Sequence, residues 1–293
     1  MNLDFISYPL GQFLHFIYNN LAFLSYGLAI IIFTLFIRII LLPLTVKQYS
    51  SMARMQEIQP QIQEIQKRYK NDKEKLNTEL MKVYQENKVN PAGGCLPLLI
   101  QMPILFSLYY VISSPLKYML GKTDAMITEL YSKVPVSEHI ANIKDISIIN
   151  FFSRHPDQID SVSNILKSSD LLNMNFLGLN LGLVPKWNPT EIMNSPMAVQ
   201  YFALLLIPIL AAVTTFISIK FSSASTANSA GNEMAASMNR SMMMMMPLMT
   251  AFFAFSVPAG LGLYWIVNNV IQVLQQMFMN KFIIKKKKEV VDK

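Results

Sequence analysis

Five long apolar runs constrain this 293-residue chain more than any other feature. They cover residues 21–46, 96–116, 198–219, 242–257 and 261–280. A membrane-spanning α-helix needs about 20 predominantly apolar residues, and these runs provide or approach that length. Charged residues make up only 15% of the chain and the mean hydropathy is +0.33, values typical of a membrane protein with several spans. We therefore predict an all-α membrane protein with five transmembrane helices.

Lysine and arginine near the ends of the runs predict how the helices are oriented. The segment 47–95 carries nine of these residues and the tail 281–293 carries six, whereas residues 1–20 carry none. In the segment 117–197, seven basic residues are offset by eight acidic ones. Basic residues favour the cytoplasmic side of a membrane. We therefore predict an outer N-terminus, an extracellular loop over 117–197, and a cytoplasmic location for 47–95, for the loop 220–241 and for the basic C-terminal tail.

The cytoplasmic segment 47–95 has the pattern of a helical hairpin. Apolar residues recur at spacings of three and four, first in Met55, Ile58, Ile62, Ile65 and Tyr69 and then in Leu76, Leu80 and Val83. This spacing places each set on one face of a helix. Between the sets, Asn71 or Asp72 can cap the second helix, and Pro60 should kink or start the first. We predict two amphipathic helices packed against each other.

The two outer segments give weaker signals. Residues 1–20 are too short and too mixed to span a bilayer, and their aromatic side chains favour a position at the outer membrane interface. The segment 117–197 has little periodicity, so we predict a loop with some helix. Within it, the stretch NFLGLNLGLVP (175–185) is interpreted as a peripheral extended or interfacial piece.

Arg38 lies inside the first apolar run, as the only charged residue between positions 21 and 46. An arginine at the centre of a membrane helix costs about 2.5–3.5 kcal/mol on insertion scales. It lies nine residues before Lys47, so one explanation is an anchor whose guanidinium reaches lipid phosphates at the inner interface. The other explanation is a hydrated or paired site inside the helix bundle.

Other polar residues in the five runs favour the second explanation. They are Thr34, on the same helix face as Arg38, together with Gln101, Gln200, and the face formed by Trp265, Asn268 or Asn269, and Gln272. A single polar residue in a membrane helix is usually explained by hydrogen bonding between helices. Several polar faces together with an arginine indicate a wet cavity instead. Because no Asp or Glu lies in the five runs, we interpret Arg38 as a receptor for an anionic group of another molecule.

Residue composition argues against several classes of function. Cys95 is the only cysteine and the three histidines are scattered, so the sequence predicts neither disulfides nor a metal site. Ser107, Ser113 and Ser114 lie in the second run without a histidine or aspartate at membrane depth, which argues against an intramembrane enzyme. A channel or transporter would favour acidic intramembrane residues or inverted repeats, and neither is visible in the sequence.

Two long motifs carry a family resemblance. The stretches KVNPAGGCLPLLIQMP (88–103) and PAGLGLYWIVNN (258–269), with FIRIILLPLTV (36–46), resemble the YidC/Oxa/Alb membrane protein insertases, in their short bacterial form. The resemblance covers about residues 20–116 and 196–280. It implies five helices around a hydrophilic groove that is open to the cytoplasm and to lipid and closed to the outside. The central arginine of the family matches Arg38, and Thr34, Tyr264 and Trp265 match groove or substrate-contact positions.

Further groove positions are Gln200, from its place in the third helix, and Gln101 and Asn268 from the polar faces described above. The resemblance implies a protein that inserts newly made membrane proteins and helps them fold, alone or with the Sec translocon, in the bacterial cell membrane. It implies no enzymatic reaction, nucleotide, metal or other cofactor. Implied partners are nascent membrane proteins, the ribosome, the signal recognition particle pathway and anionic lipid, without sequence-specific nucleic-acid binding. The alternatives are an assembly chaperone without insertion activity, and a channel or transporter.

Two low-complexity stretches complete the pattern. The methionine run at the start of the fourth helix is either an ordinary lipid-facing surface or a soft surface that adapts to varied apolar segments. The run KKKK, residues 285–288, predicts an anchor on anionic lipid and a nonspecific contact with ribosomal RNA phosphates.

Overall fold

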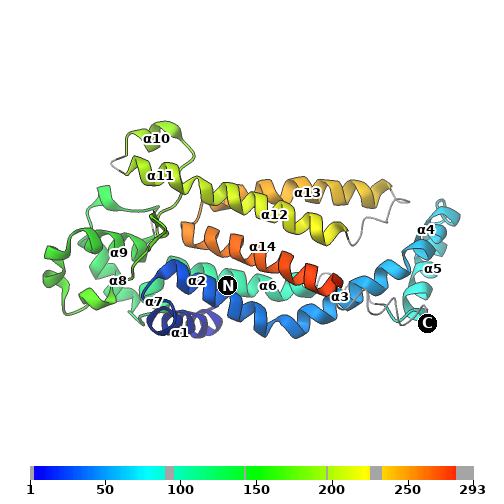
Figure 1. Ribbon diagram of the computed structural model, residues 1–293, viewed down its shortest axis with the longest axis horizontal. Coiled ribbons are helices and arrows are strands. Elements are labelled where there is room, and N and C mark those ends of the chain that lie inside the picture. Colours follow the sequence, from blue (N-terminus) through cyan, green and yellow to red (C-terminus); the bar gives the residue numbers. More distant parts are fainter. Residues whose placement is uncertain (1–2, 90–95, 142, 196, 225–232, 282–293) are drawn as a thin grey trace. The chain divides into compact units, whose positions relative to one another are not determined.

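The computed structural model describes residues 3–89, 96–141, 143–195, 197–224 and 233–281. Cys95, positions 225–232 of the predicted loop and positions 282–293 of the predicted tail lie outside the described residues. Helices make up most of the regular structure, in agreement with the predicted all-α class, and one short antiparallel hairpin joins them (Figure 1).

The α-helices are α1 (Asp4–Asn20), α2 (Tyr26–Ile40), α3 (Leu42–Glu57), α4 (Gln59–Arg68), α5 (Lys73–Glu86), α6 (Leu96–Ser113), α7 (Pro115–Tyr118), α8 (Asp124–Ser132), α9 (Lys144–Arg154), α10 (Pro189–Met193), α11 (Ala198–Leu204), α12 (Leu206–Ala224), α13 (Glu233–Ala254) and α14 (Ala259–Met279). Short 3-10 helices are η2 (Val136–Glu138), η3 (Pro156–Val162) and η4 (Ser168–Asp170), and the strands are β1 (Asn175–Phe176) and β2 (Leu179–Asn180).

The helices differ in whether their length and composition suffice to cross a membrane. Among the described residues, the stretch Ala198–Ser222, which joins α11 and α12, is long and apolar enough to do so. The pair α2 and α3 also qualifies if it is one span broken at Leu41, and Pro43 in the first turn of α3 accounts for a break there. Gln101–Ser113 and Met243–Ala254 are shorter apolar helices. The number of five spans therefore stays a prediction.

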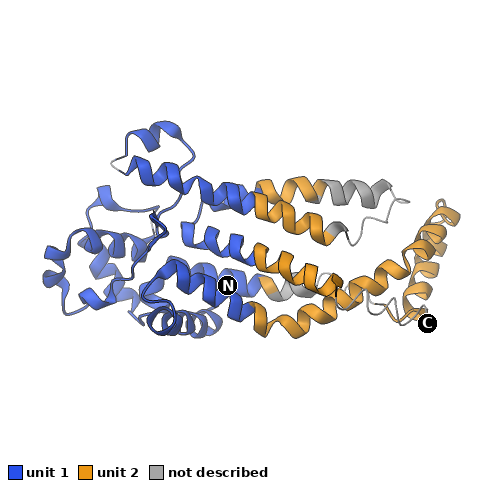
Figure 2. Cartoon of the chain, in the orientation of Figure 1, with its two compact units in different colours: residues 1–37, 102–212, 249–268 blue, residues 38–101, 213–248, 269–293 orange. Residues whose placement is uncertain are grey.

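The chain divides into two compact units, coloured separately in Figure 2. Unit 1 comprises residues 1–37, 102–212 and 249–268, and unit 2 comprises residues 38–101, 213–248 and 269–293. The boundaries fall within α2, α6, α12, α13 and α14, so long helices contribute residues to both units.

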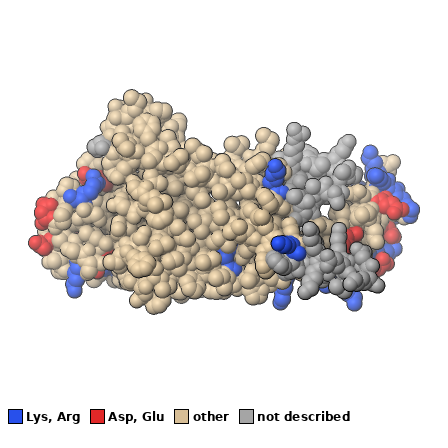
Figure 3. Space-filling view, viewed as in Figure 1, with Lys and Arg blue, Asp and Glu red and all other residues tan. Residues whose placement is uncertain are grey.

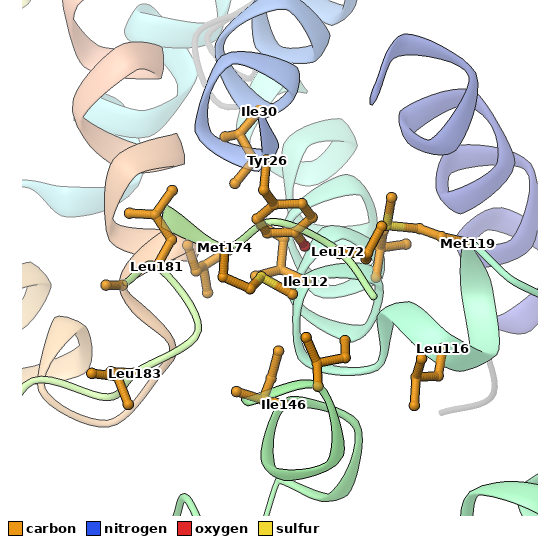
Figure 4. Close-up of a cluster of buried hydrophobic side chains, with 14 of the residues drawn as sticks. Tyr26, Ile30, Ile112, Leu116, Met119, Ile146, Leu172, Met174, Leu181 and Leu183 are labelled. Carbon is orange, nitrogen blue, oxygen red and sulfur yellow. The ribbon is translucent and has the colours of Figure 1, made fainter. Parts of the chain in front are cut away.

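Unit 1 has one apolar core, to which the predicted membrane helices and the outer segment 117–197 both contribute. Figure 4 shows Tyr26 and Ile30 of α2, Ile112 of α6 and Ile146 of α9 near Leu181, which follows strand β2. Each of these five side chains is at most 1% exposed. Burial of such a side chain contributes roughly 1.5–3 kcal/mol. The outer segment and the membrane helices are therefore one folding unit at this end.

The outer segment is more regular than the sequence predicts. It contains α8, α9, three 3-10 helices and the β-hairpin. The stretch 175–185 is extended over β1 and β2 and exposed at Leu177, as predicted, but its second half is not peripheral. Leu181 and Leu183 of that stretch are each 1% exposed and lie in the core of unit 1. The burial of Leu181 and Leu183 was not predicted because β1 and β2 have two residues each, too few for a strand period to develop.

Backbone carbonyls of the outer segment accept hydrogen bonds from the first N–H groups of two long helices. The Asn173 carbonyl accepts from the N–H of Tyr26, at the start of α2, over 3.2 Å. At the start of α14, the Leu183 carbonyl accepts from the N–H of Ala259 and the Leu181 carbonyl from that of the next residue, both over 2.8 Å. The first four N–H groups of a helix have no partner within the helix. The outer segment therefore caps α2 and α14.

Helix α1, in the segment predicted to lie at the outer interface, is fastened to α7. The Gln12 amide donates to the carbonyls of Tyr118 and the following residue, each over 3.0 Å. The Tyr118 hydroxyl donates to the Asp4 carboxylate over 2.7 Å. Other side chains of α1 point away from the core, among them Phe5 and Phe16, which are 75% and 55% exposed. An exposed aromatic face of this kind suits the predicted interfacial position.

Unit 2 contains the predicted helical hairpin, formed by α4 and α5. Pro60 lies in the first turn of α4, and the Asp72 carboxylate caps α5 by accepting from the N–H of Lys75 over 3.1 Å. Ile62 of α4 and Val83 of α5 are 4% and 9% exposed and belong to one small apolar cluster. The predicted stripes thus meet, and the cluster is separate from the core of unit 1.

Charged side chains are unevenly distributed within each unit (Figure 3). In unit 1, the acidic residues after Asp4 lie in the segment 117–197, and so do all the basic residues. In unit 2, the hairpin carries most of the charged atoms that Figure 3 shows. Outside the segment 117–197, the surface of unit 1 visible in Figure 3 is almost free of charge, as expected for helices that contact lipid.

Candidate functional site

Arg38, in the last turn of α2, is held by a residue near the end of the chain. Its guanidinium Nη2 donates to the Gln272 amide oxygen of α14 over 3.3 Å, across 234 positions of sequence. The side chain of Arg38 is half-buried. A guanidinium carries five N–H donors, so an amide oxygen occupies only part of its donor capacity. Because Gln272 is neutral, this contact orients the cation without neutralising its charge.

A second polar contact in unit 2 joins α14 to α12. The Asn269 amide donates to the hydroxyl of Thr215 over 2.8 Å and to that of Thr214 over 3.3 Å. Asn269 also lines a small pocket of about 130 Å³, whose other walls are mostly aliphatic. Three residues apart on α14, Asn269 and Gln272 face the same side of that helix. The polar face predicted for the last run therefore contacts two other helices of unit 2.

The predicted groove residues of unit 1 differ in their exposure. Thr34 is 1% exposed and its hydroxyl donates to the Ile30 carbonyl of its own helix over 2.6 Å. Tyr264 is also 1% exposed and belongs to the apolar core. Trp265 and Asn268 are half-buried. In this structure Trp265 and Asn268 are accessible to another molecule, whereas Thr34 and Tyr264 are not.

The two predicted glutamines have different surroundings. Gln200, in α11, is half-buried, and its amide oxygen is buried without a hydrogen-bond partner among the described residues. A buried polar atom of this kind is normally satisfied by water or by a ligand. Gln101, in α6, is half-buried and belongs to unit 2 together with Arg38.

Close packing around Gly262 fixes the start of α14. A Cβ atom at this position would collide with the Ile207 side chain of α12. At Gly260, a Cβ atom would lie 3.2 Å from Ile30 of α2 and 3.4 Å from Ile112 of α6. The glycines of the motif PAGLGLYW thus allow α14 to approach its neighbours closely, immediately before Trp265.

Three contacts of the site were missed at the level of sequence. Gln272 was recognised as part of a polar face but not as the acceptor for Arg38, and Thr214 and Thr215 were not singled out. Their signal was the pair of adjacent threonines in an otherwise apolar run. The described residues contain no group of three or more potential metal ligands. The side chains described above offer hydrogen bonds and one positive charge.

Comparison with known proteins identifies the family. The 60Kd inner membrane protein family matches residues 16–287, which covers both units. The chain belongs to this family. The match extends over the outer segment as well as over the five apolar runs.

Similar proteins carry one common name. A protein of Caldanaerobacter subterraneus named "Membrane protein insertase YidC" is 34% identical over 277 residues, which are 94% of this chain and 95% of that protein. A protein of the same name from Clostridium perfringens is 33% identical over 255 residues, 87% of this chain and 78% of that protein.

Other relatives are much longer than this chain. The protein of the same name from Geobacter sulfurreducens is 29% identical over 280 residues, which are 94% of this chain but 37% of that protein. The chain therefore spans well under half the length of several curated relatives that it matches.

Proposed function

We propose that this protein is a membrane protein insertase, which places newly made proteins in the bilayer and assists their folding. The main support is membership of the family together with the name of a relative that matches over 95% of its own length. The observation that carries the mechanism is the half-buried Arg38 guanidinium, oriented by the neutral amide of Gln272.

The physical task of an insertase is to carry a short polar segment across hydrocarbon. Burying unsatisfied polar groups is costly, so unassisted crossing is slow. A groove that is wet to mid-depth would shorten the dry part of the path, and Gln101 and Arg38, both in unit 2, are polar residues that would line it. We propose that such a groove opens to the cytoplasm and sideways to lipid.

Arg38 would supply a favourable interaction along this path. At a separation of 5 Å and an effective dielectric constant of 20, a guanidinium attracts a carboxylate by about 3 kcal/mol. Acidic residues in the outer tail of a substrate would therefore be drawn to the groove. The apolar helix of the substrate would then move sideways into lipid, driven by hydrophobic transfer, past accessible residues such as Trp265.

The proposal includes the orientation and the partners predicted above. The N-terminus lies outside and the C-terminus in the cytoplasm of a bacterial cell membrane. The ribosome and the signal recognition particle pathway deliver nascent membrane proteins, the Sec translocon participates for some of them, and anionic lipid contacts the basic tail. The hairpin α4–α5 projects into the cytoplasm, where it can receive these partners.

Reconstituted insertion tests the role of Arg38. Purified wild-type protein, Arg38→Lys and Arg38→Ala are placed in proteoliposomes, and insertion is measured for two single-span substrates that differ only in an acidic or a neutral outer tail. Arg68→Ala, which removes an exposed arginine from the hairpin, is the matched control. We expect the lysine and control variants to retain insertion, and the alanine variant to lose insertion of the acidic-tailed substrate selectively.

Two other results would change the interpretation. If Arg38→Ala inserts both substrates as well as wild type, Arg38 is an anchor or a hydration site and the charge-attraction mechanism is wrong. If wild-type protein inserts neither substrate but still promotes assembly of a membrane complex, the protein is an assembly chaperone without insertion activity.

A further inference from the structure

A basic pocket in unit 2 has no role in the mechanism proposed above. It has a volume of about 260 Å³ and is lined by Val46, Lys47, Ser50, Ser51, Arg54, Lys88 and Val89. Lys47, Ser50, Ser51 and Arg54 follow one another at helical spacing along a single face of α3. Lys88 comes from a different segment, two residues beyond the end of α5.

The pocket concentrates positive charge. Three of its seven lining residues are cationic and none is acidic, and the two serines add hydroxyl donors. The ion pairs of the described residues include neither Lys47, Arg54 nor Lys88. In the hairpin, Arg68, Lys75 and Lys82 pair with local carboxylates, whereas Lys47, Arg54 and Lys88 line one cavity.

The backbone at Lys88 is strained. Lys88 has φ +52°, in the left-handed region that favours glycine. The N–H of Val89 donates to the Tyr84 carbonyl over 2.9 Å and the N–H of Lys88 to the Gln85 carbonyl over 3.1 Å. This is the Schellman arrangement that ends many helices, in which the residue at the position of Lys88 is usually glycine. A lysine there costs conformational energy, and such strain is found where a side chain serves a function.

Packing next to Lys88 holds its side chain at the pocket. Val89 is 7% exposed and belongs to the apolar cluster of the hairpin, together with Ile58 at the end of α3. The strained turn therefore brings Lys88 to the basic face of α3, in a position that depends on the hairpin being folded.

We propose that the basic pocket binds the phosphate group of an anionic phospholipid in the cytoplasmic leaflet. Arginine and lysine recognise phosphate oxygens through charge-assisted hydrogen bonds, to which Ser50 and Ser51 can add. The pocket begins at Val46, the last residue of the first predicted span, where we expect the lipid headgroups to lie. Its two valines suit the boundary with acyl chains. This site does not depend on insertion activity.

Lipid binding by the purified full-length protein tests the proposal. Native mass spectrometry in detergent compares phosphatidylglycerol with phosphatidylcholine of the same acyl chains, for wild type, Lys88→Gly, Arg54→Gln and the control Lys70→Gln, which removes an exposed lysine from the turn between α4 and α5. We expect wild type to prefer phosphatidylglycerol, and Lys88→Gly and Arg54→Gln each to weaken that binding about tenfold. The control should bind as wild type does.

Stability separates loss of the site from loss of the fold. Lys88→Gly relieves the strained backbone, so its melting temperature should equal or exceed that of wild type while its lipid affinity falls. Inorganic phosphate should compete with phosphatidylglycerol for wild-type protein.

Three outcomes would overturn the proposal. One is unchanged phosphatidylglycerol affinity in both variants. Another is binding of inorganic phosphate without any preference for phosphatidylglycerol, which would make a free anion the ligand. A third is that Lys88→Gly and Arg54→Gln weaken binding of the RNA homopolymer poly(U) but not of phosphatidylglycerol. That result would assign the pocket to a nucleic-acid backbone.

Discussion

Replacing Asp145 by asparagine should stabilise the outer segment at neutral and alkaline pH. Asp145 lies in the first turn of α9 and is 4% exposed. Its carboxylate accepts from the backbone N–H of Lys117 over 3.2 Å. Burial raises the pKa of Asp145 from its ordinary 3.8 to about 6, against the opposing effect of hydrogen bonds from the N–H groups of Lys117 and Leu116. The folded state therefore holds a proton on Asp145 more tightly than the unfolded chain does.

The size and sign of the effect follow from this difference. A shift of about two pKa units corresponds to about 3 kcal/mol. The stabilising contribution of the protonated form is fully present below about pH 4 and is lost as the pH rises through about 6. At pH 8 the buried carboxylate thus costs the fold about 3 kcal/mol, which the neutral asparagine of Asp145→Asn does not.

Hydrogen–deuterium exchange of peptides from α7 and α9 measures this contribution. Protection factors, corrected for the intrinsic pH dependence of exchange, are compared for wild type and Asp145→Asn between pH 4 and pH 8. We expect the variant to be up to about 100-fold better protected at pH 8. The two proteins should converge near pH 4. The control is Asp157→Asn, which changes an exposed carboxylate in η3.

The reasoning would be refuted by wild-type protection that rises with pH over this range. Equal protection of the two proteins at pH 8 would have the same meaning, because Asp145 would then carry no burial cost. An effect of similar size in Asp157→Asn would show that the response reflects the net charge of the segment and not the buried site.

Three further substitutions test other parts of the fold. Gly262→Ala should destabilise the packing of α14 on α12 by about 1–3 kcal/mol, because the new Cβ collides with Ile207. Thermal unfolding in detergent measures this loss. An unchanged melting temperature would contradict the close approach of the two helices. Ile62→Ala should cost the hairpin about 2–4 kcal/mol, seen as faster exchange in α4 and α5 with α9 unaffected. Lys88→Gly should stabilise the end of α5 by about 1 kcal/mol, seen as slower exchange there, whereas faster exchange would show that its backbone is not strained.

Local signals in the sequence predict the hairpin well. A cap such as Asp72 and a helix-starting proline such as Pro60 act within one turn, so the residues that decide the structure are adjacent in the chain. Within α4, the apolar residues Ile62 and Ile65 likewise indicate one helix face directly, whereas the structure breaks the predicted stripe at Ile58, so that Met55 belongs to α3. Each of these features can be recognised before the partner helix is known.

Contacts between residues far apart in the chain could not be predicted from local signals. The sequence indicates that Arg38 and Gln272 are both polar residues in apolar runs, but nothing in it states that they meet across 234 positions. The burial of Leu181 could not be predicted either, because the strand that it follows, β2, has only two residues and shows no period. Tyr264 illustrates the converse, since family resemblance suggests substrate contact but not that the side chain is 1% exposed.

The carbonyl groups that cap α14 are synthesised well before the helix whose N–H groups they accept. Leu181 and Leu183 leave the ribosome about 80 residues before Ala259, which at typical elongation rates is roughly 4–16 s earlier. During that interval the N–H groups of α14 that will donate to these two carbonyls have not yet been synthesised. Helix α14 is synthesised after this segment, and its first N–H groups gain these carbonyl partners when it docks. A substitution that disrupts residues 175–185 should therefore leave α14 undocked. Cellular proteases should then cleave the chain near α14, some 80 residues after the substituted position.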